Sequence, residues 1–286
     1  MKLARYSYEG KVSIGLVVGD QIVDIPQRLP HVPPSIKAVF AGGDQLLDDI
    51  RKLQGSSDLK GALLADVKLE APVPDPQKYL AIGMNYQDHA EEAEAKGVPI
   101  PKSQLWFNKQ VSCITGPFDS VVYPRVSSKL DYEAELGVVI GKRCRYVSEE
   151  DAHSVVGGYF VANDLSARDW QAASPTFTLG KSFDTHGPIG PWIVTADDIA
   201  NPHDLEMSLL VNGVQRQRTN TSKMIYNIWQ QISYLSQVMT LEPGDLIATG
   251  TCANVGMATG NLLKPGDIVR VEIEKVGHIE NKVIGE

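Results

Sequence analysis

The stretch Asp131-Tyr132-Glu133-Ala134-Glu135-Leu136-Gly137-Val138-Val139-Ile140 decides the fold. Its second half is apolar and rich in β-branched residues, which predicts a buried strand. Its first half alternates acidic and non-acidic residues, and side chains two positions apart on a strand point to the same face. We therefore expect Asp131, Glu133 and Glu135 to share one face at the point where the strand enters the core.

This acidic face predicts a bound cation. Three like charges repel each other, and burying an unpaired carboxylate costs free energy. Asp164 directly follows another predicted strand, Gly157–Asn163, and adds a carboxylate at a strand end. Carboxylate oxygens suit Mg²⁺ or Mn²⁺. The alternative is that these acids alternate on an exposed edge strand without binding a metal.

Composition limits the function classes. The 286 residues contain 27 Lys and Arg against 35 Asp and Glu, which gives a net charge of −8 and argues against binding to nucleic acid or anionic membranes. No apolar run is long enough to span a bilayer, and the first residues lack an apolar signal core. The three cysteines form no CxxC pair, so neither a zinc site nor a disulfide framework is indicated. We expect a cytoplasmic protein.

The chain divides at a Pro-rich segment, residues 71–76, into a small N-terminal α/β domain of residues 1–70 and a larger domain of residues 71–286. In the larger domain, strand patterns outnumber helix patterns, so the predicted fold class is α+β, mainly β. The clearest helix pattern covers Ser222–Leu241. Another helix is expected to begin at a capping Asn85 and to continue to about Lys96.

His89 and Glu92 lie three residues apart on that second helix, and therefore on one of its faces. A carboxylate at this spacing can orient the imidazole and raise its basicity, which gives a general base for water. The alternative is an acidic helix surface that carries a histidine by chance.

Lys181 follows a glycine in Leu179-Gly180-Lys181-Ser182-Phe183-Asp184-Thr185. The glycine permits a close backbone approach, and a lysine at such a place can hold an anionic substrate or stabilise an oxyanion. The alternative is an ordinary surface lysine in a loop. The common serine-hydrolase, P-loop and Gly-x-Gly-x-x-Gly signatures are absent from the sequence.

Five ordered motifs resemble those of the fumarylacetoacetate hydrolase superfamily, and within it the bacterial acylpyruvate hydrolases and 2-hydroxyhepta-2,4-diene-1,7-dioate isomerases. The resemblance covers about residues 79–286. The motifs that carry it are Gly83-Met84-Asn85-Tyr86-x-x-His89-Ala90-x-Glu92, Asp131-Tyr132-Glu133-Ala134-Glu135-Leu136, Asn163-Asp164-x-Ser166-Ala167-Arg168-Asp169-x-Gln171, Gly180-Lys181-Ser182-Phe183-Asp184-Thr185 and Pro188-x-Gly190-Pro191 with Thr249-Gly250-Thr251.

The resemblance implies a mixed β-roll catalytic domain that forms a homodimer. It implies that Glu133, Glu135 and Asp164 bind Mg²⁺ or Mn²⁺, and that Asp131 has only a supporting role. It also implies a site whose other members are the water-activating pair His89 and Glu92, the catalytic Lys181, and the substrate-binding Arg168, Gln171, Thr185 and Thr251.

Two segments depart from the family pattern. The family often continues Thr-Gly-Thr-Pro-x-Gly-Val-Gly, whereas this chain has Thr251-Cys252-Ala253-Asn254-Val255-Gly256. The segment between Gln171 and Gly180 is also shorter than in close relatives. Both are expected near the substrate entrance, so they bear on specificity rather than on the metal.

The resulting hypothesis is a metal-dependent hydrolase that cleaves a C–C bond in an acylpyruvate or a related 2,4-diketo acid, such as a fumarylpyruvate-like compound, and releases pyruvate. The metal would stabilise the departing enolate, His89 would deprotonate water, and Lys181 would stabilise negative charge. The alternatives are an oxaloacetate decarboxylase, an isomerase of unsaturated 2-oxo diacids, and a non-catalytic metabolite-binding dimer.

Overall fold

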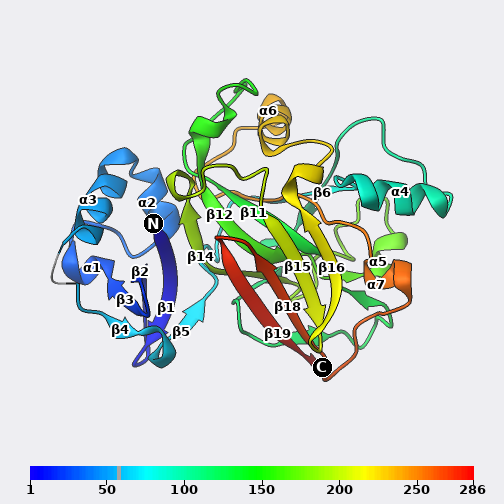
Figure 1. The fold of residues 1–286 in the computed structure, drawn as a ribbon, viewed down its shortest axis with the longest axis horizontal. Coiled ribbons are helices and arrows are strands. Elements are labelled where there is room, and N and C mark those ends of the chain that lie inside the picture. The colour runs from blue at the N-terminus through cyan, green and yellow to red at the C-terminus, as the bar shows by residue number, and fades with distance from the viewer. Residues whose placement is uncertain (57–58) are drawn as a thin grey trace.

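The apolar half of the acidic stretch forms strand β11 (Ala134–Ile140), which lies inside a large mixed sheet (Figure 1). The structure is a computed structural model, which describes residues 1–56 and 59–286. All seven residues of β11 are buried, as an apolar strand covered on both faces should be. It pairs antiparallel with β12 (Val156–Asn163) on one side and β17 (Leu246–Ala248) on the other.

The large sheet combines antiparallel and parallel pairs; for example, β17 runs parallel to β6. Its strands, in spatial order, are β4 (Ala62–Leu63), β3 (Gln21–Asp24), β2 (Lys11–Val18), β1 (Lys2–Tyr8), β14 (Gly187–Thr195), β12, β11, β17, β6 (Tyr79–Gly83) and β7 (Leu105–Lys109), with β5 (Lys68–Glu70) on β1 and β8 (Ile114–Thr115) on β14.

A second sheet packs against the large one. Its strands, in spatial order, are β16 (Val214–Asn220), β15 (Glu206–Val211), β18 (Ile268–Ile273), β19 (Gly277–Gly285) and β9 (Val121–Tyr123), and β10 (Leu130–Asp131) pairs separately with β13 (Ser166–Ala167). The main apolar core joins the two sheets, with Leu136, Val161, Leu209 and Val271 among its fully buried members.

The helices are short and lie at the edges of the sheets (Figure 1). They are α1 (Ile25–Arg28), α2 (Ile36–Ala41), α3 (Asp44–Gln54), α4 (Gln87–Ala95), α5 (Arg168–Ala172), α6 (Ile228–Val238) and α7 (Gly256–Thr259). In Figure 1, α1 to α3 belong to the N-terminal unit at the left, and α4, α5 and α7 gather at the opposite end. Among residues 1–56 and 59–286, each helix is too short or too polar to cross a bilayer.

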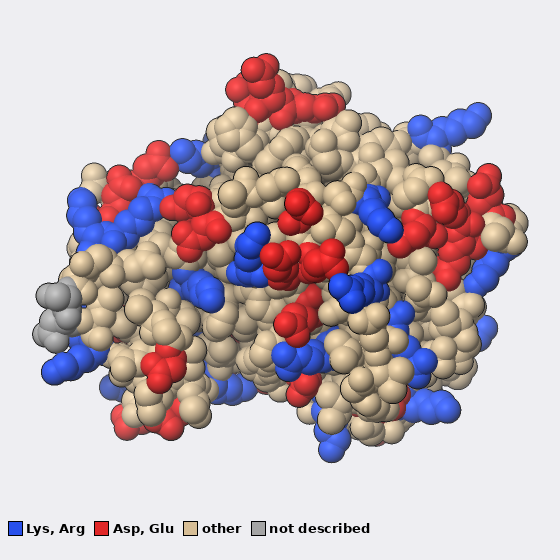
Figure 2. Space-filling view, viewed as in Figure 1, with Lys and Arg blue, Asp and Glu red and all other residues tan. Residues whose placement is uncertain are grey.

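This architecture confirms the predicted α+β, mainly β fold class. Residues 1–70 contribute β1 to β5, and β1 pairs with β14 at Lys2↔Val194, so the large sheet runs on from the N-terminal segment. A second apolar core, which includes Leu3, Phe40 and Phe160, lies along this junction. The division into domains at residue 70 stays a prediction. On the face shown in Figure 2, acidic and basic side chains are interspersed.

The acidic strand is not continuous, contrary to the expectation. It breaks at Tyr132 and Glu133, between β10 and β11. Side chains replace strand partners at the break: Asn163 Oδ1 accepts the Glu133 N–H at 3.0 Å, and Gln217 Oε1 accepts the Ala134 N–H at 3.0 Å. Asp131 therefore does not share a strand face with the two glutamates.

Two helix predictions also need correction. The expected helix Ser222–Leu241 shortens to α6 because Met224 forms a β-bridge with Tyr86, and Asn227 supplies the capping box that begins the helix. Asn85 does not cap α4. Its side-chain amide instead donates to the carbonyls of Thr249 and Tyr226, at 2.8 and 2.9 Å, and so joins distant segments.

Candidate metal centre and active site

Three buried carboxylates meet where β11 and β12 lie side by side. Each of Glu133, Glu135 and Asp164 offers an oxygen, and these atoms lie within 4.8 Å of one another. The register of the two strands explains the meeting, because Ala134 pairs with Asn163 and the Asp164 N–H donates to the Glu133 carbonyl at 2.9 Å. Segments far apart in sequence therefore supply one acidic cluster.

Three cationic side chains surround the acidic cluster, and those of Lys109 and Lys181 are buried. The Lys181 ammonium donates to Glu133 Oε2 at 2.6 Å and to Asp164 Oδ2 at 2.7 Å. Lys109 contacts the other oxygen of Asp164 at 2.5 Å, and the Arg168 guanidinium lies 2.7 Å from Glu133 Oε1. Two of the three carboxylates are thus held by charge-assisted bonds, which fix their positions.

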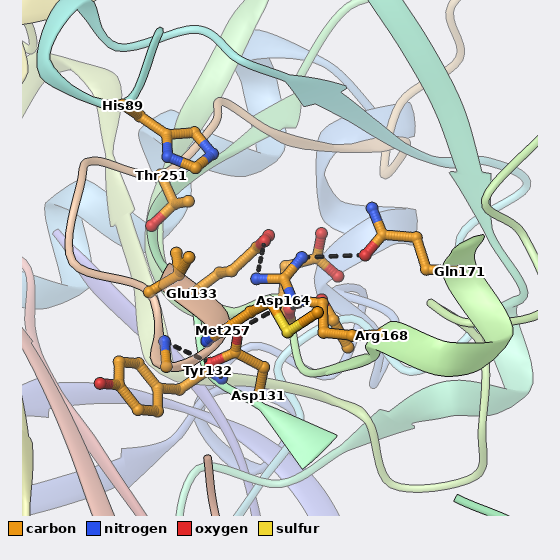
Figure 3. Close-up of polar contacts among 12 residues, drawn as sticks. His89, Asp131, Tyr132, Glu133, Asp164, Arg168, Gln171, Thr251 and Met257 are labelled. Atoms are coloured by element: carbon orange, nitrogen blue, oxygen red, sulfur yellow. Dashed lines mark hydrogen bonds and ion pairs between the residues drawn. The ribbon is translucent and has the colours of Figure 1, made fainter. Parts of the chain in front are cut away.

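Asp131 holds Arg168 from the opposite side. Its Oδ2 accepts from Arg168 Nε at 2.8 Å and from the Met257 N–H at 2.9 Å, while Oδ1 accepts from the Gly256 N–H at 2.6 Å. Figure 3 shows Arg168 between Asp131 and Glu133, with Gln171 beyond it. Asp131 is therefore a support for the site, in agreement with the role that the family resemblance implies.

The two glutamates differ in their electrostatics. Burial alone would raise the pKa of Glu133, but the charges of Lys181 and Arg168 outweigh it and lower this pKa to about 2. Burial, followed by the charges of Asp164 and Glu133, raises the pKa of Glu135 well above its usual range. Among the described residues, the Glu135 carboxylate has one recorded hydrogen bond, from the Gly250 N–H at 2.8 Å, and no cation in contact.

This donor set fits a divalent cation. The three acids offer only oxygen, which Mg²⁺ and Mn²⁺ prefer. The uncompensated Glu135 carboxylate, fully buried beside two other acids, is where an added positive charge would be most stabilising. Glu133, Glu135 and Asp164 are the residues that would hold the ion.

The acidic cluster opens into a cavity of about 260 Å³. Its walls come from α4, α5, α7 and the strands around them, and the site residues that line it are His89, Glu92, Glu133, Glu135, Arg168, Gln171, Lys181 and Thr251. Apolar side chains, including Leu105, Phe107, Phe177 and Met257, cover much of the remaining wall. Such a pocket, mostly apolar with a few converging polar groups, is typical of a small-molecule site.

His89 and Glu92 face this cavity from α4. His89 Nδ1 lies 3.4 Å from Glu92 Oε2, and the two side chains are 18% and 19% exposed. Glu92 also accepts the Asn254 N–H at 3.3 Å, which fixes its second oxygen. Figure 3 shows His89 beside Thr251, apart from the ion-paired groups.

The remaining predicted substrate-binding residues divide into two groups. Gln171 accepts from Arg168 Nη1 at 2.9 Å, and Thr251 accepts from Gln217 Nε2 at 3.0 Å, and both line the cavity. The structure places Thr185 elsewhere: its hydroxyl accepts the Val122 N–H at 2.9 Å, so it holds strand β9 and is not one of the lining residues.

Sequence reasoning missed Lys109. Its ammonium is fully buried and donates to Asp164 Oδ1 and to the carbonyls of Lys181 and His186. The alternation of side chains along β7 could have indicated that Lys109 is buried, because Phe107 and Lys109 share the buried face of this strand. A lysine on the inward face of a strand requires an anionic partner.

The structure also explains why residue 180 is a glycine. A Cβ at this position would lie 2.3 Å from the Gln171 backbone nitrogen. The chain can therefore pass close to α5 only with glycine here, and the following Lys181 then enters the acidic cluster.

A cluster of buried carboxylates beside a pocket that also holds a histidine is typical of small-molecule binding sites, including those of enzymes. A comparison with known protein families identifies the family to which this chain belongs. Residues 78–284 match the family described as fumarylacetoacetate (FAA) hydrolase C-terminal, and the chain belongs to this family. The family assignment made from the sequence motifs is confirmed.

Named relatives cover nearly the whole chain. The mitochondrial oxaloacetate tautomerase FAHD2A of Bos taurus is 40% identical over 270 residues, 93% of this chain and 85% of that protein. The 2,4-didehydro-3-deoxy-L-rhamnonate hydrolase of Sphingomonas sp. (strain SKA58) is 40% identical over 282 residues, 97% of this chain and 94% of that protein.

One similar protein has been solved with bound ligands. The maleylpyruvate hydrolase of Sphingobium sp. SYK-6, in complex with manganese(II) ion and pyruvate, has a TM-score of 0.83 and 36% sequence identity, and the match covers 100% of this chain and 99% of that one. This relative and the acidic cluster described above agree with the predicted Mg²⁺ or Mn²⁺.

Proposed function

We propose that this protein hydrolyses a carbon–carbon bond in an acylpyruvate or a related 2,4-diketo acid and releases pyruvate. The observation that carries the proposal is the position of the His89–Glu92 pair, which faces the same cavity as the acidic cluster without being part of it. Hydrolysis needs both parts: a centre that holds the oxo acid and a separate base that activates water.

The base is His89. A hydrogen bond from Nδ1–H to Glu92 leaves the lone pair of Nε2 free to accept a proton from water. The water oxygen bonds to the distal carbonyl carbon of the substrate, and the bond between that carbon and the methylene group breaks. The electron pair leaves with the pyruvate fragment as its enolate, and the proton held by His89 returns to the methylene carbon.

A divalent cation at Glu133, Glu135 and Asp164 would supply Lewis-acid stabilisation of the pyruvate fragment. The chain's own cations contribute beside it. Lys181 lines the cavity and has three N–H groups, of which two donate to Glu133 and Asp164. The third is available to an oxygen of the substrate, which would stabilise developing negative charge. Arg168 and Gln171 form the adjacent wall and would orient the carboxylate.

A second candidate reaction is tautomerisation of oxaloacetate, which the name of the 40% identical bovine relative suggests. Isomerisation of unsaturated 2-oxo diacids and decarboxylation of oxaloacetate belong to the same group of alternatives. All of them proceed through an enolate, but none needs water to attack a carbonyl carbon. The role of His89 therefore separates hydrolysis from these reactions.

The test is an ultraviolet-monitored screen of acylpyruvates, 2,4-diketo sugar acids and oxaloacetate with Mg²⁺ and Mn²⁺, performed on the wild type and on His89→Ala. We expect cleavage of an acylpyruvate by the wild type and its loss in His89→Ala, with turnover of oxaloacetate spared. Equal turnover of acylpyruvates by the two proteins contradicts the assignment of His89.

The screen also decides between an enzyme and a metabolite-binding protein. A Mn²⁺-loaded wild type that binds pyruvate or oxalate but converts no 2-oxo acid would be a non-catalytic binder. The homodimer and the cytoplasmic location stay predictions.

A further inference from the structure

We propose that Lys96 determines specificity by binding a second, distal carboxylate of the substrate, so that the preferred substrates are dicarboxylic 2-oxo acids. This inference rests on the proposed function, because it concerns the far end of the same cavity. It adds a residue that none of the family motifs contains.

Lys96 is an exposed residue that directly follows α4 as its C-cap, at the rim of the cavity. His89, Glu92 and Ala93 of α4 also line the cavity, and with Lys96 they have the i, i+3, i+4 and i+7 spacing of one helix face. At 1.5 Å per residue, Lys96 lies about 10 Å beyond His89 along the helix axis. A ligand that reaches the Lys96 ammonium must extend past the His89–Glu92 pair.

Lys96 differs from the other lysine and arginine side chains of the cavity wall. Arg168 is ion-paired with Asp131 and Glu133, and Lys181 is ion-paired with Glu133 and Asp164. Among the residues that the structure describes, no carboxylate lies within ion-pair distance of Lys96. Its recorded partner is a neutral group, the Ala258 carbonyl, at 2.7 Å. Its positive charge is therefore available to an anionic ligand.

A row of contacts joins α4 and Lys96 to the segment 253–258. Asp88 accepts the Ala253 N–H at 3.3 Å, Glu92 accepts the Asn254 N–H at 3.3 Å, and Lys96 donates to Ala258. The three side chains repeat every four residues, so they form one stripe along the helix. The same segment departs from the family pattern, which ties this contact row to specificity rather than to the metal centre.

The cavity wall between the His89–Glu92 pair and Lys96 is apolar. Ala93, Val255 and Met257 line it, and none of them can bind a charge or a hydroxyl through its side chain. A carbon chain would pack on this wall, and its terminal carboxylate would meet the Lys96 ammonium. The combination favours a second carboxylate at the chain end over a polyhydroxylated acyl group.

Binding of matched ligand pairs tests the inference on the Mn²⁺-loaded protein. The pairs are 2-oxoglutarate with 2-oxovalerate and 2-oxopimelate with 2-oxoheptanoate, because each pair differs only in a terminal carboxylate against a methyl group. We expect the wild type to bind at least one diacid about fivefold more tightly than its partner, as one ion pair with an exposed lysine would provide. Lys96→Met should abolish this preference, and Lys96→Arg should retain most of it.

Lys102→Met is the matched control, since Lys102 is an exposed lysine outside the set of cavity-lining residues. It removes the same charge and should leave the preference unchanged. A wild type that binds both members of every pair equally, or a Lys96→Met protein that keeps the preference, overturns the inference and leaves the proposed function intact. Failure of the wild type to bind any 2-oxo acid overturns both.

Discussion

The candidate metal centre and the α4 wall of the same cavity are built in opposite ways. In the candidate metal centre, the Glu133 side chain is 7% exposed and the Asp164 side chain is fully buried, and charged partners hold both. On the α4 wall, His89 and Glu92 are 18% and 19% exposed and meet at 3.4 Å. The first is part of the core of two sheets, and the second is carried by a short helix at the edge.

The two sides of the cavity are therefore held by different kinds of contact. Glu135 lies within the paired β11 and β12 strands and Glu133 and Asp164 lie at their ends, whereas α4 contacts segment 253–258 through a few side chains. Two relatives with the same 40% identity are named for different reactions, a tautomerase and a hydrolase.

The largest expected effect is on the metal-centre side. Glu135→Ala should weaken binding of Mn²⁺ by about a thousandfold or more, because it removes one of three ligands and a full negative charge. The protein should remain folded, since Glu135 makes no recorded ion pair among the described residues. Calorimetric titration with Mn²⁺ and far-ultraviolet circular dichroism measure the two quantities, and unchanged metal affinity would contradict the ligand assignment.

Lys109→Met should destabilise the protein by about 3–5 kcal/mol, because it leaves the buried Asp164 carboxylate with one counter-charge fewer. Urea unfolding of the metal-free protein measures this free energy. The control is Lys142→Met, whose ion pair with Asp44 is exposed and should contribute less than about 1 kcal/mol. Similar losses in the two variants would show that Lys109 does not support the centre.

The affinity for metal should rise with pH. Because the pKa of Glu135 is raised, a proton occupies this carboxyl until the metal displaces it, so the affinity should increase by up to about tenfold per pH unit below that pKa. Titrations in buffers of different ionisation enthalpy should show release of a proton from the wild type. The absence of a proton release would argue that Glu135 is already ionised.

The stability of the metal-free protein should depend on pH through the ionisation of Glu135 and Glu133. The raised pKa of Glu135 gives a contribution that is present below the unfolded value of 4.5 and is lost as pH rises through the folded pKa. The lowered pKa of Glu133 gives the reverse, a contribution present above 4.5 and lost as pH falls towards about 2. Glu135→Gln should remove the loss of stability at high pH and keep the loss at low pH. Urea unfolding at a series of pH values measures both.

The smallest expected effect is on the α4 wall. Asp88→Ala removes the first contact of the row along α4 and should lower stability by no more than about 1 kcal/mol, since a single hydrogen bond of 3.3 Å is lost. Its Mn²⁺ affinity should equal that of the wild type, while the KM for the substrate rises severalfold. A loss of metal affinity in this variant would mean that the wall and the centre are not independent.

The sequence predicted the parts of the site that rest on local spacing. Glu133 and Glu135 lie two positions apart at the start of β11, Asp164 follows a strand end, and His89 and Glu92 follow helical spacing. These rules act within a few residues, so they survive folding. The α+β fold class followed in the same way from the density of strand patterns.

The parts that failed depend on partners distant in sequence. The break in the acidic strand requires the side chains of Asn163 and Gln217, and the late start of α6 requires the bridge between Met224 and Tyr86. Lys109 reaches Asp164 across 55 positions of sequence. Only the folded chain brings such groups together.

The central claim is that water activation on α4 is separate from metal binding in the core. Its most direct test is the rate of acylpyruvate cleavage by His89→Ala at saturating Mn²⁺, with metal occupancy determined on the same sample. We expect full occupancy of the metal site and a cleavage rate at least about a hundredfold lower than that of the wild type. Cleavage at the wild-type rate, or loss of the metal together with the rate, would contradict it.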